Sequence, residues 1–311
     1  MIESPIPSPA EGEFLVRSLY LSVDPYMRGR MNAGRSYATP VEIGGLMGGG
    51  GVGEVIESKH PGYRPGDVAV LQTGWQQYAI SNGKGARKVD PSAAPITTAL
   101  GVLGMTGLTA YFGLLEICGV KPGETVVVSG AAGAVGSVVG QIAKLKGCRT
   151  VGIAGGAKKT EFIQKECGFD AALDYKASTD YTADLAVLCP DRVDVYFDNT
   201  GGPISDAVFA HLNFFSRVAI CGQIAHYNDA HPPMGPRLLR YVLVNRTKVQ
   251  GFIVSDHQDR HAAALVQLTQ WFKEGKIRCR EDVVEGFENM PRALMGLFTG
   301  ENIGKRVVKV G

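Results

Sequence analysis

The sequence predicts an α/β protein in which a doubly wound, six-stranded parallel sheet is joined to a second, β-rich domain. Three observations lead to this prediction. Residues 124–147 combine a strand, a glycine turn and an amphipathic helix, residues 12–83 hold short apolar runs cut by glycine and proline, and strands alternate with helices over 125–254. With 311 residues, 45% of them hydrophobic, the chain can bury two cores.

The glycine turn within 124–147 suits a dinucleotide. Gly133 would let the backbone approach a pyrophosphate, and Gly136 would let the helix lie close to the strand. The helix N-terminus offers free N–H groups and the positive end of the helix dipole. Ala131 takes the place of the usual first glycine, so a tight turn in another kind of α/β domain stays open. The favoured interpretation is the opening of a Rossmann domain.

The N-terminal region is typical of a compact β domain, a partly open barrel. Its apolar runs are short and regularly spaced, and they lie at 14–16, 19–23, 51–56, 67–71 and 75–80. The glycine cluster at 44–53 could be taken for a phosphate loop. No helical pattern or Lys-Ser/Thr pair follows it, so we favour close backbone packing inside the barrel.

The order of elements predicts the domain limits. A helical stretch at 99–115 leads into alternating strands and helices, which end with a sixth strand at 249–254. An amphipathic helix after Arg260, a helix at 290–298 and a strand at 305–310 form an α+β tail. We therefore expect a substrate domain over 1–97, a Rossmann domain over 98–255 and a segment over 256–311 that returns to the substrate domain.

Composition argues against several classes of protein. A formal net charge of +2 and the absence of a long basic run give no support for a nucleic-acid or anionic membrane partner. The first residues lack the pattern of a signal peptide, and no apolar stretch is long enough to span a bilayer. The six cysteines are far apart with no C-x-x-C pair, which is typical of reduced, buried thiols. We expect a cytoplasmic protein without a structural disulfide or a cysteine-built zinc site.

The end of the second strand indicates which nicotinamide cofactor is bound. NAD-specific sites place an acidic residue there, but this chain has Gly155 and Gly156, followed by Lys158 and Lys159. A missing carboxylate leaves room for a 2′-phosphate, which a nearby cation would stabilise. Solvated lysines in a first helical turn are the alternative, although cations there oppose the helix dipole. Tyr175, at the end of the third strand, could stack or hydrogen-bond on the same side of the cofactor as these lysines. The missing carboxylate and the lysines together predict NADPH as the cofactor.

Several longer motifs resemble one family. They are Leu19-Tyr-Leu-Ser-Val-Asp-Pro-Tyr-Met-Arg-Gly-Arg30, Gly104-Met-Thr-Gly-Leu-Thr-Ala-Tyr111, Phe197-Asp-Asn-Thr-Gly-Gly202, Cys221-Gly-Gln-Ile-Ala-His-Tyr227 and Glu285-Gly-Phe-Glu-Asn-Met-Pro291. With residues 131–147 and 300–305, the chain resembles the zinc-independent branch of the medium-chain dehydrogenase/reductase superfamily, that of prostaglandin, alkenal and curcumin reductases. The resemblance covers nearly the whole chain and implies that the β-rich domain is GroES-like.

The resemblance implies roles for individual residues. Residues near the glycine turn would hold the pyrophosphate, Lys159 and Tyr175 the adenosine end, and Phe252 to Val254 the nicotinamide, with Asn302 closing over it. The implied cofactor-binding residues are Gly133, Ala134, Val135, Gly136, Lys159, Tyr175, Asn199, Cys221, Gly222, Gln223, Ile224, Tyr227, Phe252, Ile253, Val254 and Asn302. Asn199 and Asn302 are also plausible turn residues, and Phe252 a plausible core residue.

The chain departs from the family pattern in two ways. Family members usually carry about a strand's worth of extra residues before Ile2, so the chain is either a truncated form or a natural short one, and a barrel edge would be left unpaired. A tyrosine that some relatives place after the sixth strand is not evident near Ser255. His257 is a candidate substitute, or no acid is needed at that place.

The expected chemistry is the reduction of an activated alkene. The histidines and cysteines show no metal-ligand spacing, so no Lewis acid is predicted. NADPH would deliver hydride to the β-carbon of an α,β-unsaturated ketone or aldehyde, and the resulting enolate would be protonated. Tyr26 and Tyr37 are candidates to bind the carbonyl or donate the proton. The ribose 2′-hydroxyl competes for that role, and packing is an alternative for each tyrosine.

Two alternatives remain for the function. One is a quinone reductase of the same superfamily, although the segments 24–27 and 285–291 favour the alkenal branch, and the other is a non-catalytic NADPH-binding protein. The resemblance implies a homodimer through pairing of sixth strands, with a small-molecule enone or alkenal as the other partner. The substrate is not fixed, because the pocket walls come from loops, including 31–37 and 227–236.

Overall fold

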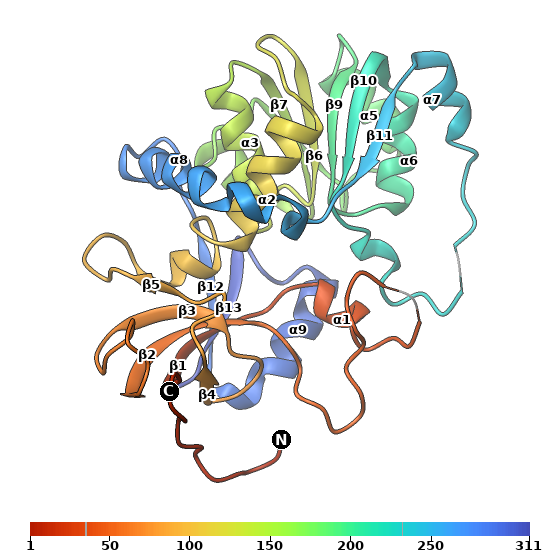
Figure 1. Cartoon of the computed structure of the whole chain (residues 1–311). Coiled ribbons are helices and arrows are strands. Elements are labelled where there is room, and N and C mark those ends of the chain that lie inside the picture. Colours follow the sequence, from red (N-terminus) through yellow and green to blue (C-terminus); the bar gives the residue numbers. More distant parts are fainter. Residues whose placement is uncertain (35, 232) are drawn as a thin grey trace. The chain divides into compact units, whose positions relative to one another are not determined.

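The computed structural model describes residues 1–34, 36–231 and 233–311. The chain divides into two compact units, of which the first combines Met1–Gly101 with Glu281–Gly311 and the second comprises Val102–Arg280. Each unit has its own sheet (Figure 1). The sequence placed the boundaries at 97 and 255. The structure places residues 256–280 with the second unit, and only the last 31 residues, 281–311, with the first unit.

The first unit is a mainly antiparallel sheet with strand order β12-β13-β1-β2-β3-β5, and β4 pairs with β1. Its elements are β1 (Phe14–Ser22), α1 (Tyr26–Gly29), β2 (Gly50–Ser58), β3 (Val68–Gln72), β4 (Tyr78–Ser81), β5 (Arg87–Val89), η1 (Ile96–Leu100), β12 (Glu281–Glu285), η5 (Phe287–Asn289), α9 (Met290–Thr299) and β13 (Lys305–Lys309). The C-terminal strand β13 pairs with the N-terminal β1, so the two ends of the chain build one sheet.

The glycines of β2 permit close packing. A Cβ on Gly53 would lie 2.3 Å from the Arg17 carbonyl oxygen, and one on Gly51 would lie 2.3 Å from Thr73 Oγ1. Neither distance is possible for a real side chain, so only glycine lets β1 and the chain after β3 approach this strand. The prediction of backbone packing at this cluster is confirmed for these two positions.

A buried ion pair anchors α1 to the C-terminal strand. Lys305 Nζ on β13 lies 2.6 Å from Asp24 Oδ1, and it also donates to the carbonyl of Val23 at 3.1 Å. The side chains are 3% and 6% exposed. Ser22 Oγ donates to the other oxygen of Asp24, so the carboxylate is satisfied on both sides. The start of α1, which carries Tyr26, is fixed by this pair.

The second unit is a six-stranded parallel sheet with order β11-β10-β9-β6-β7-β8, the doubly wound arrangement that the sequence predicts. Its elements are α2 (Met105–Phe112), the π-helical turn η2 (Gly113–Ile117), β6 (Thr125–Ser129), α3 (Gly136–Leu145), β7 (Arg149–Ala154), α4 (Ala157–Lys165), β8 (Ala171–Asp174), α5 (Tyr181–Leu188), β9 (Val193–Asp198), α6 (Gly202–Ala210), β10 (Leu212–Ile220), η3 (Ile224–His226), α7 (Leu239–Asn245), β11 (Lys248–Gly251), η4 (Val254–Arg260) and α8 (His261–Lys273).

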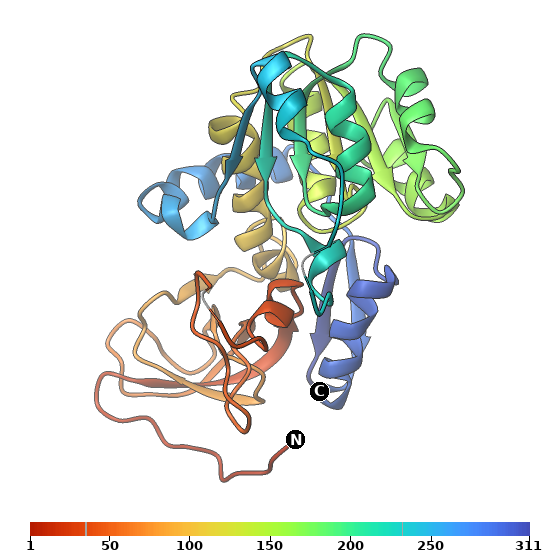
Figure 2. The same cartoon turned by 90° about the vertical axis from the view of Figure 1, so that its right-hand side faces the viewer.

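Helices cover both faces of this sheet, with α2 and α3 packed together on one face and α5 and α6 on the other (Figures 1 and 2). This is why β6 is a continuous apolar run: Val126, Val127 and Val128 are all fully buried. The sixth strand ends earlier than the sequence predicts. β11 ends at Gly251, so Phe252 to Val254 leave the sheet.

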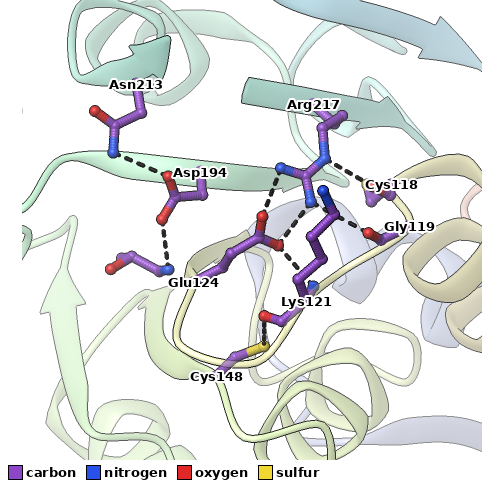
Figure 3. A network of polar contacts seen from close by, with 9 residues as sticks. Cys118, Gly119, Lys121, Glu124, Cys148, Asp194, Asn213 and Arg217 are labelled. Carbon is purple, nitrogen blue, oxygen red and sulfur yellow. Dashed lines mark hydrogen bonds and ion pairs between the residues drawn. The ribbon is translucent and has the colours of Figure 1, made fainter. Parts of the chain in front are cut away.

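The amino ends of the strands are held by an ionic network (Figure 3). Arg217 at β10 forms two parallel hydrogen bonds to the Glu124 carboxylate, at 2.8 and 2.6 Å, and donates to the carbonyls of Cys118 and Gly119. Asp194 accepts from the backbone N–H of Thr125 at 2.9 Å. These bonds tie β6, β9 and β10 together at the edge opposite the candidate site.

Candidate functional site

The glycine turn after β6 leaves a helix N-terminus open. Gly130 has φ +60°, and a Cβ on Gly136 would lie 2.4 Å from the carbonyl oxygen of Gly130. Among the described residues, a Cβ on Gly133 would meet within 4 Å only that same oxygen, at 3.2 Å. In this part of the chain α3 has no side-chain cap. The N–H groups of Ser137 and Val138 donate to the carbonyls of Gly133 and Val135, so the N–H groups of Val135 and Gly136 are the ones left for solvent or a ligand. The geometry fits the pyrophosphate of a nucleotide.

The carboxyl end of β7 forms the next part of the edge. A Cβ on Gly155 would lie 2.6 Å from Tyr175 Cζ, so the tyrosine ring packs directly over this turn. Gly156 has φ +94°, and its N–H donates to Asp174 Oδ1 at 2.7 Å. Lys159 lies in the first turn of α4, partly exposed. The predicted adenosine residues Lys159 and Tyr175 therefore flank one glycine turn, and Asp174 binds backbone N–H groups there.

The carboxyl end of β9 is built around a carboxylate that sequence reasoning missed. Asp198 is 1% exposed. It accepts hydrogen bonds from Ser205 Oγ at 2.7 Å, from the backbone N–H groups of Thr200 and Gly201 at 2.9 Å, and from Tyr196 and Ser129 at 3.0 Å. An acidic residue directly after the apolar residues 195–197 was the available signal. Asp198 orders the loop that carries Asn199.

Asn199 joins this loop to the glycine turn. Its side chain donates to the Ser129 carbonyl at 2.7 Å, and its backbone N–H donates to Ser129 Oγ at 2.9 Å. Next to it, the Thr200 hydroxyl is buried and finds no hydrogen-bond partner within the described part of the chain. A Cβ on Gly130 would lie 3.5 Å from Thr200 Cγ2, so this unpaired hydroxyl belongs to the edge where a nucleotide fits.

The turn after β10 continues the edge. The Cys221 backbone N–H donates to the Asp198 carbonyl at 2.8 Å, and the Gln223 N–H donates to the Tyr227 hydroxyl at 3.2 Å. Gln223 Nε2 also reaches Asp198, at 3.3 Å. Burial, together with the charge of Asp198, raises the pKa of the Cys221 thiol to about 12. Cys221 is therefore a protonated thiol at neutral pH, not a nucleophile.

Phe252 to Val254 follow β11. Phe252 is 8% exposed, and its ring meets Phe197 edge-on, with ring centroids 6.1 Å apart. Ile253 and Val254 are partly exposed at the start of η4. The side chain of His257, the candidate substitute acid, is only 13% exposed, and its ring is stacked on Phe112. His257 is thus engaged in packing within its own unit.

Three of the predicted residues lie in the other unit. Tyr26 is partly buried under the Arg30 guanidinium, which lies 5.0 Å from its ring centroid. Burial raises the pKa of Tyr26 well above its usual value, and nearby Asp24 and Tyr37 add to the effect. Tyr37 is 63% exposed. Asn302 donates to the carbonyl of Gly304 at 3.0 Å, as its alternative role in a turn requires.

The structure thus brings most of the predicted cofactor residues to one edge of the parallel sheet, formed by the carboxyl ends of β6, β7, β9 and β10. It does not bring Tyr26, Tyr37 or Asn302 into that unit. Two segments, 31–37 and 227–236, include Arg35 and Pro232, which lie outside the described residues. The predicted role of these segments in the pocket walls remains a prediction.

Three further features of the described residues concern metal binding, the cysteines and the membrane. Within 1–34, 36–231 and 233–311 no group of three or more His, Cys, Asp or Glu could hold a metal ion. All six cysteines are free thiols, and four of them are buried. Over the same residues, the helices are too short or too polar to cross a bilayer.

A parallel doubly wound sheet with an open glycine turn, joined to a β-rich unit, defines a nucleotide-dependent oxidoreductase. A family model described as the N-terminal domain of oxidoreductase matches residues 1–89, and one described as zinc-binding dehydrogenase matches residues 134–270. The described residues offer no zinc site to go with the second description.

The chain is 46% identical to an NADPH-dependent curcumin reductase of Escherichia coli K12, over 99% of this chain and 90% of that protein. It is 47% identical to mouse prostaglandin reductase 1, over 98% and 91%. The crystal structure of CurA from Vibrio vulnificus in complex with NADPH superimposes with a TM-score of 0.95 at 46% identity, covering 100% and 93%. The chain belongs to the medium-chain dehydrogenase/reductase superfamily, in its zinc-independent branch of prostaglandin and curcumin reductases.

Proposed function

We propose that this protein uses NADPH to reduce the carbon–carbon double bond of α,β-unsaturated ketones and aldehydes. The observation that carries the proposal is the end of β7, where Gly155, Gly156 and Lys159 stand in place of a ribose-binding carboxylate. This turn leaves room for the 2′-phosphate. Relatives that match this chain over about nine tenths of their own length include enzymes named as curcumin and prostaglandin reductases.

The cofactor would bind along the sheet edge. The N–H groups of Val135 and Gly136, at the start of α3, would hold the pyrophosphate, since a helix N-terminus favours an anion and Gly133 keeps the approach free of a side chain. The Lys159 ammonium would pair with the 2′-phosphate. Phe252 to Val254 would border the nicotinamide, because they leave the sheet at its carboxyl edge.

Bound NADPH supplies a hydride, which goes to the β-carbon of the substrate and leaves an enolate. The enolate then needs a partner for its oxygen and a proton at its α-carbon. Tyr26 is a candidate for the first role, because its phenol is protonated at neutral pH, as is usual for tyrosine, and can donate a hydrogen bond. Tyr37 is an exposed phenol of the same unit that could deliver the proton. Asn302 would close over the cofactor.

The proposal is tested by mixing the protein with NADPH and a panel of enones, alkenals and quinones, and by identifying the products by mass spectrometry. Saturated ketones or aldehydes are expected, with NADPH preferred to NADH. Lys159→Ala should raise the KM for NADPH about tenfold and leave that for NADH unchanged. Lys158→Ala, on an exposed neighbour in the same turn, is the matched control. Hydroquinones as the only products would instead identify a quinone reductase, and no turnover with any acceptor would favour a non-catalytic NADPH-binding protein.

The protein also has a surface suited to a second copy. β11 is the end strand of its sheet, paired only with β10 among the described strands. Val249 on β11 is 41% exposed, and Phe214 on the adjacent strand β10 is 61% exposed. Pairing of two β11 strands would satisfy the open backbone groups and cover these side chains. Val249→Pro should convert a homodimer to a monomer in light scattering, and a wild-type monomer would refute this assembly.

A cytoplasmic location is part of the same proposal. It is supported by six cysteines that remain free thiols in one fold, as is typical of proteins from reducing compartments. Fractionation of the native cells with an antibody to the protein would test the location.

A further inference from the structure

The turn after Phe252 to Val254 is held by an aromatic and ionic cluster that the proposed function leaves unexplained. The His257 ring lies flat on Phe112, with ring centroids 4.7 Å apart and planes inclined by 6°. Arg260 Nη2 lies 2.6 Å from His257 Nδ1. Because a guanidinium can only donate, Nδ1 must be the acceptor, and the ring proton is on Nε2.

Two further contacts fix the arginine. Arg260 Nη1 forms an ion pair with Glu116 of η2, and its guanidinium lies 5.5 Å from the Phe112 ring centroid. The Glu116 carboxylate itself is 3.6 Å from His257 Nδ1. Arg260 and His257 both lie on η4. The ion pair of Arg260 with Glu116 of η2 and the stacking of His257 on Phe112 of α2 therefore hold η4 against this helical run.

The same helical run also holds the residues before the turn. A Cβ on Gly113, the first residue of η2, would lie 2.5 Å from the Phe252 ring, so Phe252 packs directly on the backbone there. His261 Nε2 lies 2.9 Å from the Val254 carbonyl oxygen, which can only accept. The contact with Gly113 thus fixes the Phe252 end of the stretch 252–254, and the hydrogen bond from His261 fixes its Val254 end.

We propose that His257 is a positioning residue. His257 accepts a hydrogen bond from Arg260 while its ring is stacked on Phe112, and these contacts fix η4. In this way His257 positions the backbone of Phe252 to Val254 beside the nicotinamide ring. This role rests on the cofactor placement of the proposed function. His257 would then act by maintaining the shape of the nicotinamide pocket, and not as the proton donor that the sequence suggested.

Two variants separate the contacts of His257. His257→Phe keeps a ring to stack on Phe112 but removes the acceptor, whereas His257→Asn places an amide oxygen near the position of Nδ1. His257→Phe should raise the KM for NADPH about tenfold and change kcat less than about twofold, as expected for the loss of one hydrogen bond to a charged group. His257→Asn should recover most of the wild-type KM. Asp259→Asn is the matched control, because Asp259 is 75% exposed and contacts the same arginine only at 3.7 Å.

A second measurement does not depend on activity. Hydrogen exchange of the backbone amides in 252–256 should accelerate in His257→Phe, without NADPH, and remain slow in His257→Asn and in Asp259→Asn. A His257→Phe protein with wild-type exchange and a wild-type KM for NADPH would overturn the positioning role while leaving the proposed function intact. A wild-type protein that binds no NADPH would refute the proposed function instead, and with it the role of His257 at the nicotinamide.

Discussion

Two glycines of the turn after β6 should respond to alanine in opposite ways. A Cβ on Gly136 would lie 2.4 Å from the Gly130 carbonyl oxygen and 2.8 Å from Ala131 Cα, both backbone atoms. A Cβ on Gly133 would meet one atom only, at 3.2 Å. Neither glycine has a positive φ, so alanine is allowed at both positions by backbone conformation. We therefore expect that the fold requires Gly136 and that the proposed ligand requires Gly133.

The stability of the two variants follows from these distances. In Gly136→Ala the backbone must shift, and overpacking of this kind costs about 3 kcal/mol at the upper end of its usual range. For a unit of this size the Tm should fall by about 6–12 °C. Gly133→Ala should keep the wild-type Tm or exceed it slightly, because alanine lowers the conformational entropy of the unfolded chain.

The affinity for NADPH should respond differently. The methyl group of Gly133→Ala would stand between the first N–H groups of α3 and the pyrophosphate, and losing one charge-assisted hydrogen bond weakens binding about tenfold or more. Calorimetric melting without cofactor and titration of NADPH fluorescence measure the two effects separately. The reasoning is refuted if Gly133→Ala binds NADPH as tightly as the wild type, or if it melts as early as Gly136→Ala.

The remaining predictions concern buried and half-buried charges. Lys305→Met leaves the Asp24 carboxylate buried without its cation and should lower the free energy of unfolding by about 3–5 kcal/mol, measured by urea denaturation. Asp24→Asn in the same protein should restore part of the loss, and no recovery would contradict the pairing. Burial opposes ionisation of Asp170, but the hydrogen bonds from Lys144 and the Thr150 N–H outweigh it and lower the pKa of Asp170. Its contribution is present above the unfolded pKa of about 4 and is lost as the pH falls through the folded pKa, so Asp170→Asn should destabilise at pH 7 and have little effect in strong acid. An equal effect at both pH values would argue against this interpretation.

The parallel sheet and the glycine turn could be predicted because their signals are local. The apolar run of β6, the turn residues and the helix-period pattern of α3 are adjacent in the sequence, and each has one structural solution. Phe252 shows where such patterns stop being informative. Its apolar neighbours extend the strand pattern to residue 254, but hydrogen bonding to β10 ends at Gly251, and only the partner strand determines that end.

The placement of α8 could not be read from its own residues. Its apolar face requires some partner, but many surfaces would serve. The structure supplies the partner in α2, and Gln141 of α3 fixes the following chain by bonding the backbone of Arg278 at 2.9 and 2.7 Å. For this reason residues 256–280 lie with the nucleotide-binding unit, although the sequence suggested that they belong to the returning tail.

The carboxylate of Asp198 raises a question of electrostatics, because it is buried at the edge where an anionic pyrophosphate is proposed to bind. A like charge there would oppose binding if it were unsatisfied. Asp198 instead accepts hydrogen bonds from the N–H groups of Thr200 and Gly201 and from three hydroxyl groups. Its partners are up to 69 residues away, so no local pattern announces them. The loop after β9 and the glycine turn after β6 therefore use their N–H donors for different acceptors. The loop after β9 uses its N–H groups to stabilise the chain's own carboxylate, and the N–H groups of Val135 and Gly136 at the uncapped start of α3 are left for the proposed anion.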